Sequence, residues 1–399
     1  MTCYHPHTAY QAIGVLNPET GKKIIRYSAK DMYKIKYNFH LDYDVYKCKS
    51  DAYDYSYRPI TLPCGNCIGC RLDKARTWAL RNYHEAQMSS GSCFITLTFG
   101  DEATIDNVFR LDQFKNLSRN AKFKEARKRV NTLVRGDFSA FIKRLRKELR
   151  NGFEYYDSSG HKRYFRLRSG LRFYACGEYG DLNSRPHYHA LIYNFDFPGK
   201  VYIATERGNV YWTHPVLERA WGYGFVYISD FTINTANYVS RYVTKKINGR
   251  LKDEWYCGLE PEYQVCSNRP GIGRSWFEKF HKDVYPTDEV LYPTRKGKQI
   301  KMKPPKYYDA LYDKFSPEEF SEVKKFRELW ISQHEKLPSF ILERTPERLS
   351  VKEEIQRLRM KKLIRSFERM RVNNPIDVIL SKCNEYGIPY RILGRGDPP

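Results

Sequence analysis

Two histidines at alternate positions form a motif with the chemistry of a metal site. They lie in P-H-Y-H-A-L-I (186–192), whose composition predicts a strand. Side chains alternate along a strand, so His187 and His189 share one face, about 7 Å apart, and Tyr188 takes the other. Hairpin pairing is expected to bring Glu178, at the end of the preceding strand, beside His187. Together they would bind a divalent cation and leave positions open for a phosphate oxygen; the alternative is half-buried strand histidines.

A second motif combines two tyrosines and a lysine. Residues 234–247 predict a helix, on which Tyr238, Tyr242 and Lys245 follow one exposed stripe at i, i+4 and i+7. A phenol with a pKa near 10 is a poor nucleophile, but a cation on the scissile phosphate and a nearby lysine would make it competent. The product would be a phosphotyrosine ester. Because the chain has 33 tyrosines, ordinary aromatic packing is the alternative.

A third motif has the spacing of zinc ligands. Cys64, Cys67 and Cys70 form C-x-x-C-x-x-C, with glycines between them to relieve crowding. A structural zinc needs a fourth ligand, for which Cys3 is the first candidate, then Cys48, then His5. The alternative is three reduced surface thiols.

Basic residues near these motifs are candidate DNA contacts. Arg241 and Lys246 belong to the tyrosine helix, and Arg269 and Arg274 flank a glycine-rich loop whose backbone could approach phosphate. The loop lacks the G-K-[ST] of a Walker motif, and a plain turn before the next helix explains it equally well.

Secondary structure must position these groups. Strands are predicted over 92–99, 171–178, 187–195 and 224–229, and helices after the cysteines, over 138–149, from Pro215 behind a Thr213 cap, and over 234–247. This order predicts an α+β fold with an antiparallel sheet.

Composition restricts the partner. The 399 residues contain 69 Lys and Arg against 46 Asp and Glu, a net charge of +23, which disfavours a neutral metabolic enzyme and favours nucleic acid. Aromatic residues make up 15% of the chain, which excludes a disordered basic tail and suits base stacking. No apolar run approaches the ~18 residues of a spanning helix, and no signal peptide is evident, so we expect no membrane and a reducing cytoplasm.

Four regions are expected along the chain. Residues 1–90 form an irregular, tyrosine-rich region with the zinc module, and 91–282 form the main domain. Residues 283–315 are predicted to be a basic Pro/Lys linker. Residues 316–399 are predicted to be a charged helical region, with capping boxes at Ser316 and Ser350.

Taken together, these motifs resemble the HUH endonuclease superfamily, and most closely its rolling-circle replication initiators of microviruses, of the gokushovirus type. The resemblance spans residues 62–273 and is carried by L-P-C-G-N-C-I-G-C-R (62–71), F-I-T-L-T-F (94–99), G-E-Y-G (177–180), R-P-H-Y-H-A-L-I (185–192), Y-V-S-R-Y-V-T-K-K (238–246) and R-P-G-I-G (269–273). As in replication initiators and related transposases, the tyrosines follow the histidines.

The resemblance implies an HUH endonuclease domain at 91–282 with a five-stranded antiparallel, ferredoxin-like (RRM-like) sheet. It implies Mg²⁺ or Mn²⁺ on His187, His189 and Glu178, paired nucleophiles at Tyr238 and Tyr242, and Lys245 as the accompanying lysine. The activity would be nicking and joining of single-stranded DNA at a phage origin through 5′-phosphotyrosine intermediates.

The implied setting is the host bacterial cytoplasm, with single-stranded or supercoiled phage DNA, host helicase and host polymerase as partners. Two alternatives remain open: a transposase of the same superfamily, and a non-catalytic protein that binds single-stranded nucleic acid.

Overall fold

The computed structural model describes residues 3–38, 43–100, 116, 118, 133–168, 170–180, 185–206, 208–245, 260–294 and 297–359, without the side chains of 242–245. The chain divides into two compact units. Among the described residues, the first contains those up to Asp73 together with Glu335–Arg359, and the second contains Lys74–His334.

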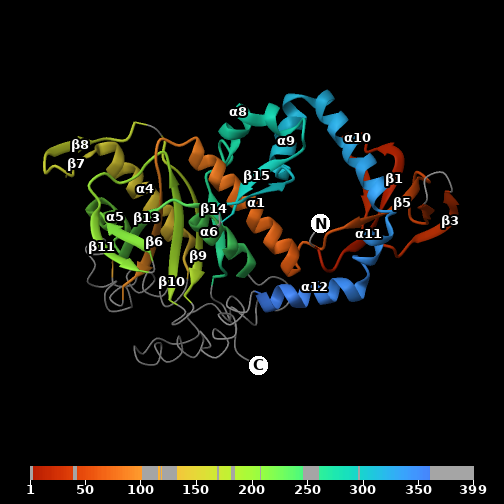
Figure 1. Ribbon diagram of the computed structural model, residues 1–399, viewed down its shortest axis with the longest axis horizontal. Coiled ribbons are helices and arrows are strands. Elements are labelled where there is room, and N and C mark those ends of the chain that lie inside the picture. The colour runs from red at the N-terminus through yellow and green to blue at the C-terminus, as the bar shows by residue number, and fades with distance from the viewer. Residues whose placement is uncertain are drawn as a thin grey trace. The chain divides into compact units, whose positions relative to one another are not determined.

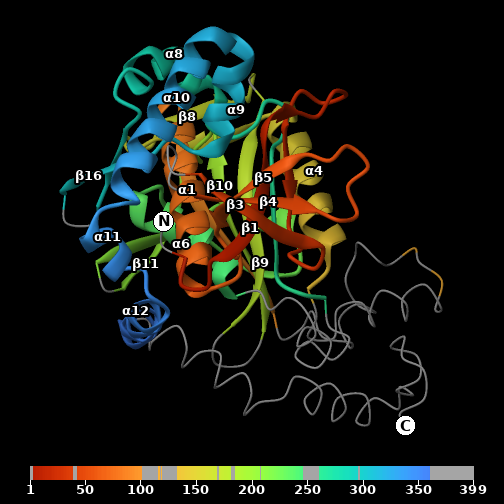
Figure 2. The ribbon, with the colours of Figure 1, turned by 90° about the vertical axis from the view of Figure 1, so that its right-hand side faces the viewer.

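The first unit contains a five-stranded antiparallel sheet where the sequence predicted irregular structure (Figure 2). Its order is β2-β1-β5-β4-β3, with β1 (His7–Leu16), β2 (Lys23–Arg26), β3 (Met32–Asn38), β4 (Tyr43–Cys48) and β5 (Ser56–Leu62). The prediction failed because these strands bury few apolar side chains, so they lack clear alternation; β3, for example, has no buried residue. The unit also contains α11 (Pro338–Leu342) and α12 (Pro346–Arg359).

The second unit is built on a seven-stranded antiparallel sheet (Figure 1). Its order is β11-β12-β13-β6-β10-β9-β14, with β6 (Ser92–Phe99), β9 (Arg172–Tyr179), β10 (Pro186–Tyr193), β11 (Val201–Glu206), β12 (Asn209–Thr213), β13 (Gly224–Asp230) and β14 (Tyr263–Cys266). The prediction of an α+β fold is therefore confirmed. The histidine-bearing sheet has seven strands instead of the expected five, because the hairpin β11–β12 extends its edge.

One face of this sheet packs on helices α4 (Arg135–Asn151) and α5 (Pro215–Trp221), and we call it the α4 face. The apolar stripe predicted for α4 is buried as expected, against Ile95, Leu97, Tyr188, Ala190 and Ile192 of the sheet. A two-stranded ribbon, β7 (Phe153–Tyr156) with β8 (Lys162–Phe165), follows α4. This core leaves the opposite face of the sheet to carry polar side chains.

The opposite face is covered in part by α1 (Ile68–Gln87) and α6 (Ile233–Lys245), and we call it the α6 face (Figure 1). Trp78 of α1 contacts Tyr174 with ring centroids 5.0 Å apart. Ala236 and Val239 of α6 are fully buried among Leu191 and Tyr193 of β10. These apolar contacts place α6 directly over the central strands β9 and β10.

Residues 283–315 contain regular structure where the sequence predicted a linker. This part of the second unit contains α8 (Arg274–Val284), β15 (Val290–Pro293), β16 (Gln299–Met302), α9 (Lys306–Phe315) and α10 (Pro317–His334). Val290, Tyr292, Tyr308 and Tyr312 are buried in a cluster that includes Leu80 of α1. Prolines and lysines dominate the composition, but the spaced apolar residues between them build a second core.

Two helix starts differ from the predicted ones. The N-cap of α5 is His214, whose Nδ1 accepts the Val216 N–H at 3.2 Å, instead of Thr213; since Pro215 is the first helical residue, the cap must directly precede it. Ser350 lies inside α12, whose start has the Thr345 hydroxyl accepting the Arg348 N–H at 3.3 Å. By contrast, α10 begins directly after Ser316, as predicted.

Within the described residues, no helix combines the length and apolar character needed to cross a membrane.

The buried imidazole of His84 should make stability depend on pH. It stacks on Trp276 at a centroid distance of 3.5 Å, and its Nδ1 lies 2.9 Å from the Tyr308 hydroxyl. Burial lowers the pKa of His84 to about 3. Between that value and about 6.5, the unfolded chain binds a proton that the folded chain does not, so stability falls as pH drops below about 6.5, by up to ~1.4 kcal/mol per pH unit.

Denaturant unfolding of wild type and His84→Gln across this range would measure the effect. The variant should show a shallower loss of stability on acidification, whereas His161→Gln, at an exposed histidine, should match wild type. An unchanged pH slope in His84→Gln would contradict the assignment.

Candidate functional site

The hairpin of β9 and β10 brings the predicted metal ligands together. Antiparallel pairing sets His187 opposite Glu178 and His189 opposite Cys176. Alternation then places Glu178, His187 and His189 on the α6 face, while Tyr188 is buried on the α4 face. The shared face of the histidines and their pairing with Glu178 are therefore as predicted.

The three side chains meet at one carboxylate oxygen. Nε2 of His187 lies 3.0 Å and Nε2 of His189 lies 2.8 Å from Oε1 of Glu178. Glu178 is only 2% exposed and His189 is 5% exposed, whereas the His187 side chain reaches solvent. One oxygen and two imidazole nitrogens within 4.8 Å of one another form a donor set that could hold a divalent cation. A buried carboxylate converging with two imidazoles fits such an ion well.

Neighbours on β6 hold His189 in this orientation. Thr96, its cross-strand partner, has its hydroxyl 3.0 Å from Nδ1 of His189, and Phe94 stacks on the ring at 5.5 Å. A hydrogen bond at Nδ1 orients the imidazole and leaves Nε2 directed at Glu178. The sequence analysis missed Thr96. The signal that could have found it is cross-strand pairing: β6 is predicted as a strand, and its alternation puts Thr96 and Thr98 on one face.

A glycine makes room for His187. The N–H of Gly180 donates to the Arg185 carbonyl at 2.9 Å and closes the hairpin next to the site. A Cβ added at Gly180 would lie 2.9 Å from Cε1 of His187. Any side chain at this position would therefore displace the imidazole, which gives the second glycine of G-E-Y-G a physical reason.

The tyrosine helix presents one described tyrosine to the histidines. Tyr238 is 46% exposed, and its ring contacts the His189 ring nearly perpendicularly, with centroids 5.1 Å apart. The helix begins behind Thr232, whose hydroxyl accepts the Thr235 N–H at 3.1 Å. Tyr242 and Lys245 belong to α6, but their side chains lie outside the described residues.

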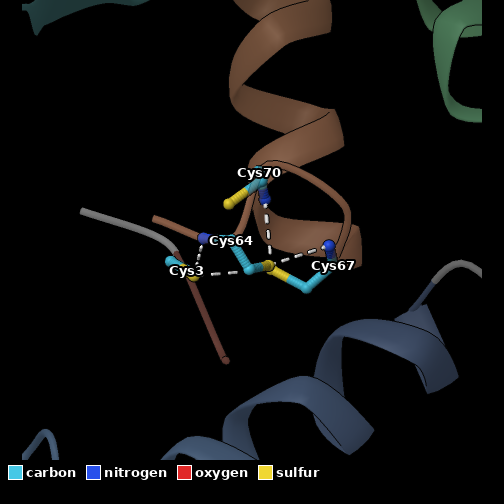
Figure 3. A group of neighbouring side chains, drawn as sticks. All are labelled: Cys3, Cys64, Cys67 and Cys70. Carbon is cyan, nitrogen blue, oxygen red and sulfur yellow. Dashed lines mark hydrogen bonds between the residues drawn. The ribbon is translucent and has the colours of Figure 1, made fainter. Parts of the chain in front are cut away.

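The four cysteines form a second group in the first unit. β1 and β5 pair with His7 opposite Leu62, so Cys3, just before β1, lies near Cys64, just after β5. The sulfurs of Cys3, Cys64, Cys67 and Cys70 all lie within 4.8 Å of one another. Figure 3 shows Cys3 against the loop of Cys64 and Cys67, with Cys70 in the first turn of α1. Four thiols at this spacing fit a closed, structural zinc site.

Backbone N–H groups surround these sulfurs. The Cys64 N–H donates to Cys3 Sγ at 3.2 Å, the Cys67 N–H to Cys64 Sγ at 3.2 Å, and the Tyr4 N–H to Cys67 Sγ at 3.3 Å. Burial opposes ionisation of Cys64, but the N–H groups of Cys67 and Asn66 outweigh it and lower the pKa of that thiol to about 7. Such donors stabilise thiolates, the form that binds metal.

The other two candidates for the fourth ligand lie elsewhere. The sulfur of Cys48 lies 3.2 Å from the Ser50 hydroxyl and does not belong to the cluster. Nε2 of His5 lies 2.6 Å from Oε2 of Glu353, a buried acid of α12. Cys3 is the candidate that the fold places with the other three.

The predicted DNA contacts are placed unevenly. Arg241 on α6 and Arg269 are exposed, whereas Arg274 pairs with Glu278 at 2.7 Å. Within the glycine-rich loop, the Gly273 N–H donates to the buried carboxylate of Glu85 at 2.6 Å, so a protein acid already uses this amide. Lys246 lies outside the described residues.

Comparison with known proteins places this site in a family. Residues 92–247 match the model of the replication-associated protein ORF2 family. The chain is 33% identical over 264 residues to the replication-associated protein VP4 of Bdellovibrio phage phiMH2K, which covers 65% of this chain and 70% of that protein. The chain belongs to the phage replication-associated protein family.

Two further relatives carry the same description. The replication-associated protein ORF2 of Spiroplasma virus 4 is 32% identical over 272 residues, 67% of this chain and 73% of that protein. The replication-associated protein ORF4 of Chlamydia phage 1 is 24% identical over 236 residues, 58% and 49% of the two chains. No solved structure matches the chain. The family match runs from β6 through α6, so it includes the Glu-His-His group and excludes the cysteines.

The cysteine group should hold zinc in the purified protein. Elemental analysis of wild type should find about one zinc per chain, and the double variant Cys67→Ser/Cys70→Ser should lose it, because two of the four sulfur ligands are gone. Cys48→Ser, at a buried cysteine outside the group, is the matched control and should keep the metal. Full zinc content in the double variant would place the metal elsewhere.

Proposed function

We propose that this protein initiates rolling-circle replication by nicking and rejoining single-stranded DNA at the phage origin. The observation that carries the proposal is the buried Glu178 between His187 and His189, with Tyr238 of α6 against the His189 ring. A binding protein without catalytic activity would have no need for a carboxylate, two imidazoles and a phenol at one point of a sheet face. Membership of the replication-associated family supports the same interpretation.

Glu178, His187 and His189 would hold Mg²⁺ or Mn²⁺. When bound, such an ion neutralises charge on the scissile phosphate and makes phosphorus a better electrophile. The residues of the chain do the rest. Thr96 and Phe94 fix the His189 ring, and the exposed edge of His187 lies at the side from which DNA can approach.

The nucleophile would be a tyrosine hydroxyl of α6. Its oxygen forms a bond to phosphorus while the bond from phosphorus to the 3′ oxygen breaks. The phenolic proton is lost to solvent or a neighbouring base, and the departing 3′ oxygen gains a proton. The result is a 5′-phosphotyrosine and a free 3′ hydroxyl that primes synthesis. Joining reverses the step: a 3′ hydroxyl attacks phosphorus and the phenol leaves, so no ATP is consumed.

A second tyrosine would allow successive rounds. After one round, Tyr238 or Tyr242, whichever is free, cuts the regenerated origin, and the released 3′ hydroxyl attacks the first ester. Both residues lie in α6, four positions apart. We place the reaction in the host cytoplasm, with host helicase and polymerase supplying unwinding and synthesis. Cleavage of phage-origin against transposon-end oligonucleotides separates this proposal from a transposase.

Cleavage should depend on the Glu-His-His group. His187→Ala should lower the rate of origin cleavage by about 100-fold or more, because one of the proposed metal ligands is removed. Binding should change little, since phosphate neutralisation by Lys and Arg dominates affinity. A gel assay with and without EDTA measures cleavage, and His161→Ala, at an exposed histidine, is the control. Undiminished cleavage in excess EDTA would refute the metal requirement.

The paired tyrosines should divide the work. Tyr238→Phe and Tyr242→Phe should each still form a covalent adduct with an origin oligonucleotide but fail at repeated rounds on a circular template. The double variant should bind DNA and form no adduct, as measured by denaturing gel and mass spectrometry. Tyr156→Phe, at an exposed tyrosine of β7, should behave as wild type. Multi-round replication by either single variant would show that one tyrosine suffices.

A further inference from the structure

The α6 face is covered on one half and open on the other. Helix α6 packs on β10, β9 and β14. On the far side of β6, β13 carries two aromatic residues that the helix leaves exposed: Phe225 is 56% exposed and Tyr227 is 37% exposed. Large exposed aromatics on a sheet are unfavourable unless they contact something, so this half of the face invites a partner.

Strand register connects these aromatics with the Glu-His-His group. Phe225 pairs with Thr98 of β6, which pairs with His187 of β10. In the neighbouring row, Tyr227 pairs with Thr96, which pairs with His189. Paired residues share a face, so both aromatics lie on the face of the histidines, two strand spacings away, or roughly 10 Å.

A third aromatic extends the row. Trp212 of β12 pairs with Ile228, which is buried on the α4 face, so its neighbour Tyr211 is on the α6 face. The Tyr211 and Tyr227 rings contact edge to face at 6.1 Å. We call Tyr211, Phe225 and Tyr227 the aromatic strip. Between it and the histidines lie the half-exposed Thr96 and Thr98, which leave the surface low and polar.

We propose that the aromatic strip stacks the bases of the single-stranded DNA next to the scissile phosphate. This inference rests on the proposed function and names how the same site holds its substrate. Exposed aromatics on a sheet bind unstacked bases through their π-faces, without reading sequence. Two rows that each run from an aromatic through a threonine to a histidine would direct the strand, base side on the strip, to the Glu-His-His group.

Single-stranded DNA fits this strip better than a protein does. The chain has a net charge of +23, which suits a polyanion. The strip ends at a group built to meet phosphate, so its occupant must carry phosphates at one edge and flat apolar faces at the other. Duplex DNA stacks its bases internally and cannot offer those faces.

Fluorescence anisotropy with a labelled dT oligonucleotide, in EDTA, tests the strip without cleavage. Phe225→Ala and Tyr227→Ala should each weaken binding by about fivefold or more. The dependence of the dissociation constant on salt should keep its slope, because no positive charge is removed. Tyr202→Ala is the matched control: Tyr202 is 61% exposed on the same sheet but pairs with Trp212, on the α4 face, and should bind as wild type.

The decisive arm uses an oligonucleotide of the same length with abasic sites throughout. Wild type, Phe225→Ala and Tyr227→Ala should bind it equally, since there are no bases to stack, and Phe225→Trp should restore binding to dT. Unchanged affinity of both alanine variants for dT, or an equal loss on abasic DNA, would overturn the proposal. Because these measurements involve no cleavage, their failure is distinguishable from failure of the nicking proposal, which His187→Ala tests separately.

Discussion

The antiparallel register of β9 and β10 is the constraint on which the candidate site depends. A carboxylate that is 2% exposed is costly unless polar groups meet it, and the imidazoles of His187 and His189 both reach one oxygen of Glu178. A slip of one residue would turn either strand's side chains to the opposite face and separate the acid from both histidines. The large apolar residues of the α4 face, such as Tyr188 and Ile192, oppose that slip because it would expose them.

The two faces of the sheet therefore have different tasks. The α4 face stabilises the fold by burying aromatic and aliphatic side chains against α4 and α5. The α6 face uses a smaller apolar patch to seat α6, and this contact places Tyr238 against His189. The space left on that face carries Thr96, Thr98 and the aromatic strip, so one helix position decides both where a nucleophile lies and which part of the sheet stays open.

The cysteine group follows the same logic with less chain. Three of its sulfurs are local in sequence, but Cys3 arrives through the pairing of β1 with β5. A bound metal would tie the start of the chain to the beginning of α1, across a sheet that buries few apolar side chains. Small sheets of this kind depend on such cross-links because their own cores stabilise them weakly.

The sequence by itself determined the local features. Alternation on 186–192 put His187 and His189 on one face, hairpin geometry brought Glu178 to them, and the C-x-x-C-x-x-C spacing located three of the grouped cysteines, with Cys3 the preferred fourth. These depend on periods of two to four residues, which short-range sterics fix. What only the tertiary structure decided involves contacts between distant segments or weak patterns: the tyrosine-rich strands of residues 7–62, the extra hairpin β11–β12, the core formed by residues 283–315, and the hydroxyl of Thr96 at His189. None of these leaves a periodic signal, because each arises from which surfaces remain to be buried once the main sheet has formed.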